Sequence, residues 1–174
     1  MASTNVKKHT LYVTTTAILA ALTTVMTAYI LHIPIGANGG YIHLGDTIIY
    51  LAACVLPTPY ACLVGIIGGG LADLLTAPAW AIPTVIIKAL IVLPFTFKKT
   101  AIVNRRNLLA PIFSGLITII GYYIAQGILF GWEASFFTSV GGNLIQAAGS
   151  AVCFIILGFA LDKAGLKRRL VSFA

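Results

Sequence analysis

Lys88 is an ammonium group inside an apolar run, separated from every other basic residue of the chain. It lies six residues into the run 82–97, which is about 9 Å along a helix at about 1.5 Å per residue. A charge that deep in a bilayer costs about 2.5–3.5 kcal/mol and needs a partner inside the protein. Asp73 and Lys88 lie seven and eight residues to either side of a turn centred near Trp80. We therefore predict an Asp73–Lys88 ion pair, which either locks this hairpin or also lines a ligand pocket.

Two pairs of polar side chains share helix faces further along the chain. Tyr122 and Gln126 are four residues apart, and Asn143 and Gln146 are three apart, so the members of each pair lie on one face. Amides inside a bilayer must bond to other helices, to water or to a ligand. Two interpretations stay open: hydrogen bonds between helices, or a pocket. Aromatic rings that stack and amides that hydrogen-bond suit a small, flat, polar heterocycle.

Catalytic and metal-binding motifs are not found in the sequence. Asp46 stands at the start of an apolar run, where it could cap a helix N-terminus. His43 has no second histidine or cysteine at ligand spacing, so we predict no metal and no cofactor. The run GIIGGGLAD lacks the Gly-Lys-Ser/Thr ending of a phosphate loop. The chain is predicted not to be an enzyme and not to hydrolyse ATP itself.

The composition is that of a membrane protein. Of the 174 residues, 59% are hydrophobic and only 9% charged, against roughly 25% charged in soluble domains. The surface must therefore face lipid. We predict an all-α, single membrane domain over residues 1–174 with six transmembrane helices, approximately 11–33, 46–56, 60–77, 82–97, 108–130 and 139–161. The segment 34–45 contains four glycines and a proline and is predicted to be a loop.

The basic residues predict the orientation. Ten of the eleven form three clusters that flank apolar runs: Lys7 and Lys8; Lys98, Lys99, Arg105 and Arg106; Lys163, Lys167, Arg168 and Arg169. This is the positive-inside pattern, not a nucleic-acid-binding stripe. Both termini are then cytoplasmic (N-in/C-in), with four helices before the basic loop and two after it. Asp46, Asp73, Trp132 and Glu133 fall at or near the outer face.

Small residues form stripes on two of the predicted helices. Ala17 and Ala21 make an A-x-x-x-A pattern, and Gly65 and Gly69 a G-x-x-x-G pattern. Such stripes let helices approach closely, within one chain or between chains.

Together these features resemble the substrate-binding S component of energy-coupling factor (ECF) vitamin transporters. The stretches GGYIHLGDTIIYLAA, GGGLADLL and IPTVIIK resemble the hydroxymethylpyrimidine/pyridoxine-type branch. The resemblance implies a multi-pass protein of a prokaryotic cell membrane that captures a vitamin or precursor from outside. It then docks on a membrane coupling (T) protein driven by two cytoplasmic ATPase subunits, and topples so that the pocket opens inward.

The resemblance also implies roles for particular residues. Ala17 and Ala21 would form the docking surface, and Asp73 would support Lys88. The substrate-binding candidates are Tyr41, His43, Lys88, Tyr122, Gln126, Trp132, Glu133, Asn143 and Gln146.

Two other functions remain as alternatives. A stand-alone secondary transporter would normally show inverted repeats and broken helices, and we find no convincing repeat. In a non-transporting membrane scaffold, every polar residue would only hold helices together.

The charge of the pocket region bears on the substrate. The three acidic residues Asp46, Asp73 and Glu133 and the basic Lys88 give this region a formal charge of −2, which disfavours an anionic vitamin.

Overall fold

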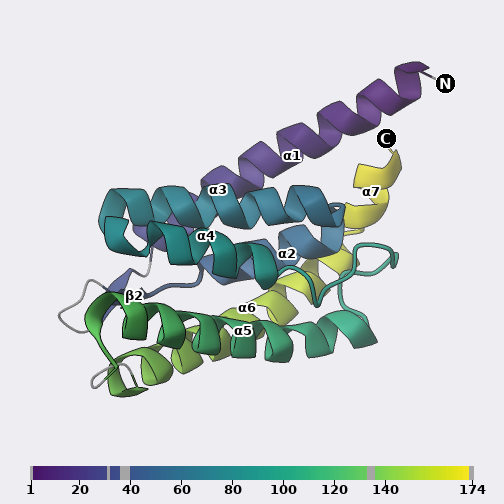
Figure 1. Ribbon diagram of the computed structural model, residues 1–174. Helices are drawn as coiled ribbons and strands as arrows, with labels where there is room; N and C mark the ends of the chain where they lie inside the picture. The colour runs from purple at the N-terminus through teal and green to yellow at the C-terminus, as the bar shows by residue number, and fades with distance from the viewer. Residues whose placement is uncertain (1, 31, 36–39, 133–135, 173–174) are drawn as a thin grey trace.

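The computed structural model describes residues 2–30, 32–35, 40–132 and 136–172 (Figure 1). Its longer helices are α1 (Ala2–Ala28), α3 (Thr58–Thr76), α5 (Arg105–Phe130) and α6 (Gly141–Lys163). Shorter helices are α2 (Gly45–Val55), α4 (Ala81–Leu90) and α7 (Leu166–Ser172), with a 3₁₀ turn η1 (Pro78–Trp80) and a π turn η2 (Phe136–Val140). Strands β1 (Ile33–Ile35) and β2 (Gly40–Ile42) form an antiparallel hairpin, where the glycine-rich sequence predicts a loop.

Within the described residues, four helices are long and apolar enough to cross a membrane. They are Asn5–Ala28 of α1, α3, α5 and α6. Helices α2 and α4 are apolar but shorter, and 10 or 11 residues reach only about 15–17 Å of the roughly 30 Å hydrocarbon core. The prediction of a helical membrane protein is thus confirmed, while six complete spans remain a proposal.

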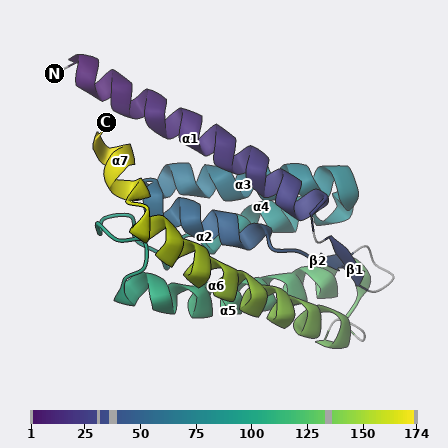
Figure 2. The ribbon, with the colours of Figure 1, turned by 180° about the vertical axis from the view of Figure 1, so that it is seen from behind.

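Contacts between distant segments define the two ends of the bundle. The ring of His9 contacts that of Tyr60, and Lys167 bonds to the carbonyls of Cys54 and Phe97. The start of α1, the α2–α3 turn, the 91–104 loop and α7 therefore share one end, which we name the basic end. The opposite end, with β1 and β2, the α3–α4 turn and the described residues next to the α5–α6 loop, is the hairpin end. Both termini lie at the basic end (Figure 2).

Prolines explain why two helices are shorter at their C-terminal ends than predicted. A proline ring clashes with the carbonyl of the residue four positions earlier in a helix. Pro94 therefore opposes helix at Leu90, where α4 ends instead of at residue 97. Pro34 likewise opposes helix at Ile30, and α1 ends at Ala28 instead of residue 33.

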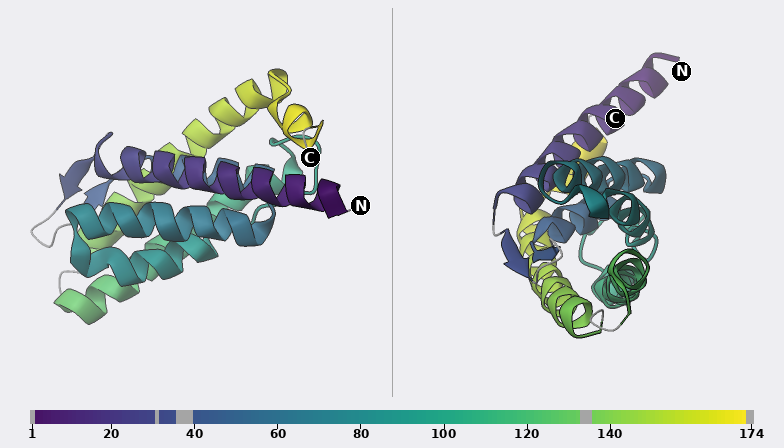
Figure 3. Two further views of the ribbon diagram at one scale, coloured as in Figure 1. Left: turned by 90° about the horizontal axis from the view of Figure 1, so that it is seen from above. Right: turned by 60° about the vertical axis from the view of Figure 1, so that its left-hand side comes forward.

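Glycines of α3 let it pack closely between α1 and α4. A Cβ atom at Gly68 would lie 2.6 Å from Cβ of Thr23 on α1, and one at Gly65 would lie 2.6 Å from the Lys88 carbonyl oxygen on α4. Figure 3 shows α1 running along α3. The glycine stripe thus serves contacts within the chain, and it brings the α4 backbone next to α3 where Lys88 is buried.

The basic end contains a buried cation that the charge pattern did not distinguish from its neighbours. Lys167 is 7% exposed and donates to the backbone oxygens of Cys54, Phe97 and Lys99 at 2.5–2.6 Å. Burial lowers the pKa of Lys167. The carboxylate of Asp162 accepts hydrogen bonds from backbone N–H groups in the same loop. These contacts fasten α7 to the end of α2, and both α6 and α7 to the 91–104 loop.

Candidate functional site

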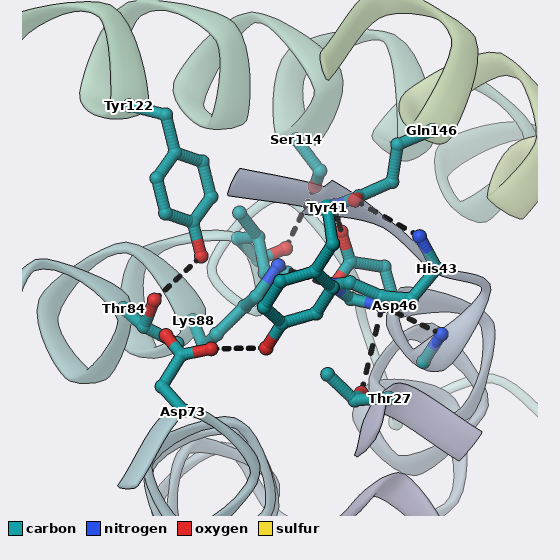
Figure 4. A network of polar contacts seen from close by, with 12 residues as sticks. Thr27, Tyr41, His43, Asp46, Asp73, Thr84, Lys88, Ser114, Tyr122 and Gln146 are labelled. Carbon is teal, nitrogen blue, oxygen red and sulfur yellow. Dashed lines mark hydrogen bonds and ion pairs between the residues drawn. The ribbon is translucent and has the colours of Figure 1, made fainter. Parts of the chain in front are cut away.

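An ion pair is buried in the half of the bundle near the hairpin end. Nζ of Lys88 lies 2.5 Å from Oδ1 of Asp46, and the two residues are 1% and 0% exposed. Oδ2 of Asp46 accepts a hydrogen bond from Nε2 of Gln146 at 3.1 Å. Helices α2, α4 and α6 each supply one of these side chains, so the network holds together three segments distant in sequence (Figure 4).

The predicted partner of Lys88 was wrong. Asp46, not Asp73, makes the ion pair. Lys88 packs against Gly65 and Gly69 of α3, which precede Asp73 by one to two helical turns, so the expected equal depth is not observed. Helix α2 is buried along nearly its whole length, and a carboxylate there has no water to solvate it. The capping role considered for Asp46 is also not observed, because the N-cap position of α2 is Leu44 and no side chain caps it.

Asp73 belongs to a second group of contacts beside the ion pair. The hydroxyl of Tyr41, on β2, donates to Oδ1 of Asp73, and Figure 4 shows the Tyr41 ring reaching across the network towards α3. Burial, with a smaller contribution from the Asp73 charge, raises the pKa of Tyr41. The hydroxyls of Thr84 and Tyr122 lie 2.7 Å apart, which links α4 to α5.

His43 connects the hairpin to this network. Its backbone N–H donates to Oε1 of Gln146 at 3.3 Å, and its Nδ1 accepts from the backbone N–H of Gly45 at 3.0 Å. Because a backbone N–H can only donate, Nδ1 carries no proton and the imidazole is neutral. Burial, and then the charge of Lys88, lowers the pKa of His43 to about 3.

This arrangement predicts that acid destabilises the protein through His43. The imidazole takes up a proton near pH 6.5 in the unfolded chain but only near pH 3 in the folded protein. Its contribution is therefore complete above pH 6.5 and is lost as the pH falls towards 3. We expect a loss of about 2 kcal/mol at pH 5. Apparent melting temperatures of wild type and His43→Gln at pH 7.5 and pH 5 measure it, with His9→Gln, an exposed histidine, as the control. An unchanged pH dependence in His43→Gln would contradict the prediction.

Aromatic rings surround the polar groups. The ring of Tyr41 stacks on His32 with centroids 4.0 Å apart. The Trp80 ring, 6% exposed, meets Tyr122 edge-on at 5.8 Å, and Nζ of Lys88 lies 5.4 Å from the Tyr122 centroid. Ring faces next to charged and amide groups can bind a flat molecule with polar substituents. No group of three or more potential metal ligands occurs among the described residues.

Comparison with known proteins identifies the family. Residues 7–163 match the profile of the family described as ECF-type riboflavin transporter, S component. This chain belongs to that family. The S component is a transporter subunit that binds a small vitamin and works with a T protein and ATPases. A Pyrococcus woesei protein described as an uncharacterized protein in the gap 3′ region is similar to this S component, 30% identical over 142 residues. The match covers 79% of the present chain and 93% of that protein.

The structure brings most of the predicted substrate-binding residues of this S component together. Tyr41, His43, Lys88, Tyr122 and Gln146 lie in or against the network. Gln126 is buried one turn beyond Tyr122.

Other predicted residues lie apart from the network. Asn143 bonds to Ser139, on the preceding turn. The Trp132 side chain is 53% exposed and packs on Tyr123. Glu133 lies outside the described residues. The two amides of α6 thus differ: only Gln146 bonds to the network.

Sequence reasoning missed Asp46 and Thr84 as members of the site. The signal for Asp46 was available, because the run 46–56 is apolar on every face, and an acid in such a helix needs a buried partner. Thr84 carried no comparable signal, since threonines inside bilayers commonly bond to their own helix backbone.

Proposed function

We propose that this S component captures hydroxymethylpyrimidine or pyridoxine at the buried network and passes it to an ATP-driven coupling module. The hairpin end would face outside and the basic end the cytoplasm, as the positive-inside rule requires of the three basic clusters. Helices α2 and α4 would then complete a six-helix membrane domain, with the β1–β2 hairpin covering the outer end of α2.

The observation that carries the proposal is a set of buried hydroxyls without hydrogen-bond partners. Among the described residues, such groups belong to Thr16 on α1 and to Tyr50, Thr118 and Ser150. Thr16 lies apart, but each of the other three stands four residues from a network residue (Asp46, Tyr122 and Gln146 respectively), one helical turn towards the basic end. Buried polar groups are almost always paired. A ligand that carries its own hydroxyl or amino groups would satisfy these hydroxyls.

The chemistry of the network favours a small ring with hydroxymethyl groups. Lys88 can donate to a ring nitrogen and Asp46 can accept from an amino or hydroxyl group, while Tyr41 and Tyr122 offer ring faces. The described charged residues in and beside the network are Asp46, Asp73 and Lys88. They give an excess of one negative charge, which disfavours phosphorylated or carboxylated vitamins. The network residues already bond to one another, so a small ligand needs to displace fewer of these contacts than a three-ring flavin.

Riboflavin is the second candidate, because the matching family carries its name. Titration of the purified chain in lipid nanodiscs with hydroxymethylpyrimidine, pyridoxine, thiamine and riboflavin separates the candidates. We expect hydroxymethylpyrimidine or pyridoxine to bind below about micromolar, or about −8 kcal/mol. Preferential riboflavin binding would overturn the substrate assignment but would still support a function in vitamin import. If none of the four compounds binds, the result would favour a non-transporting membrane scaffold.

A further inference from the structure

An apolar groove opens on the face formed by α5 and the segment that follows α4. It is lined by Pro94, Arg106, Leu109, Ala110, Phe113 and Ile117 and has a volume of about 630 Å³. Leu109 and Phe113 are more than half exposed along it, whereas Ala110 is buried and forms its floor. The groove lies towards the basic end, so it is separate from the network of Asp46 and Lys88 near the hairpin end.

The length of the groove fits one leaflet of a bilayer. Ile117 lies eleven positions after Arg106 on α5, or about 16 Å along the helix at about 1.5 Å per residue. Half of a hydrocarbon core is about 15 Å. A single acyl chain of one leaflet would therefore lie along the groove from its cationic rim to the middle of the membrane.

Arg106 is fixed at the rim of the groove by the broken end of α4. Its Nε donates to the Pro94 carbonyl oxygen at 2.9 Å, and Nη2 donates to that of Leu93 at 3.4 Å. These carbonyls follow Leu90, where α4 stops. A guanidinium has more N–H donors than these two bonds use. It can therefore bind a phosphate while it remains anchored.

We propose that this groove binds an anionic phospholipid, with an acyl chain along Leu109 and Phe113 and the phosphate on Arg106. Charge complementarity selects this occupant. Among the described lining residues the only charge is the cation at the rim, Arg106. An anionic headgroup gains about 1 kcal/mol from each basic residue near the surface. A zwitterionic headgroup cannot gain as much, so the site distinguishes the two lipid classes.

Native mass spectrometry of the purified chain with phosphatidylglycerol or phosphatidylcholine tests this. We expect wild type to retain phosphatidylglycerol about fivefold more strongly, and Arg106→Gln to lose most of that preference. Arg105→Gln is the matched control, because its exposed side chain is outside the groove lining, and it should keep the preference. Glycerol phosphate, the headgroup without chains, should not bind.

Three results would overturn the proposal. They are equal retention of both lipids by wild type, an equal loss in Arg105→Gln, and a lipid-free dimer that covers the groove. Should Arg106→Gln fail to fold, Leu109→Gln places a polar side chain in the same groove. It should weaken retention of phosphatidylglycerol, and full retention in this variant would contradict the proposal. Vitamin binding does not depend on this groove, so the two proposals fail separately.

Discussion

Lys88→Met is expected to abolish vitamin binding and to lower the free energy of unfolding by about 3–5 kcal/mol. The substitution leaves the Asp46 carboxylate fully buried with Gln146 as its remaining side-chain hydrogen-bond partner. An unpaired buried charge is strongly destabilising. Lys98→Met, which removes an exposed lysine at the basic end, should leave both quantities unchanged. Ligand titration and apparent melting temperature in the same nanodisc preparation measure the two effects.

The double variant Lys88→Met/Asp46→Asn separates binding from folding. It removes both charges, so most of the lost stability should return, because replacing a whole buried ion pair is often nearly neutral. Vitamin binding should stay lost, since neither the ammonium nor the carboxylate is then present to contact the ligand. If the double variant binds the vitamin like wild type, the pair has only a structural role, and the proposed site is wrong.

Ala17→Trp and Ala21→Trp are expected to stop ATP-driven uptake while leaving vitamin binding intact. Both alanines are exposed on α1, whereas Ala20 and Thr23 of the same helix are buried. These two small residues would let a helix of the coupling protein pack closely against α1. An indole there would hold the two helices apart without entering the core. Uptake by cells expressing the chain with its T protein and ATPases, together with binding by the purified variant, measures both effects.

Leu116→Trp is the control for size alone. Leu116 is about half exposed on α5, and tryptophan there should change neither uptake nor binding. Loss of binding in Ala17→Trp would place the alanine in the fold instead of a docking surface. Full uptake in both alanine variants would contradict a docking role for this strip. Uptake by the chain without T protein and ATPases would favour a secondary transporter.

The sequence predicted the existence of the helices more accurately than their ends. Apolar runs of sufficient length specify α3, α5 and α6 to within a few residues. The ends of α1 and α4 were placed too far along, although Pro34 and Pro94 gave the signal. The start of α1 was placed too late, since Ala2–Thr10 continue the helix outside the apolar run. The β1–β2 hairpin was not predicted, although Asn38-Gly39 between two apolar segments is a hairpin-turn signal.

Charge and burial arguments indicated a buried polar network but not its connections. The cost of burying Lys88 correctly predicted a partner, but Lys88 lies opposite Gly65 and Gly69 of α3 instead of Asp73. Which carboxylate pairs with Lys88 depends on how α2 packs against α4, and no local pattern encodes that contact. The amides of α6 show the same limit, since Gln146 and Asn143 share one face and differ by less than a turn. Only Gln146 bonds to the network.

Identification of the compound that co-purifies with the wild-type chain tests the central claim most directly. The chain is purified in a mild detergent from cells grown with all four vitamins, and the released small molecules are analysed by mass spectrometry. Lys88→Met/Asp46→Asn, purified in the same way, serves as the blank. We predict hydroxymethylpyrimidine or pyridoxine in near-stoichiometric amount with wild type and none with the double variant. Equal amounts of any vitamin in both preparations, or none in either, would contradict capture at the Asp46–Lys88 network.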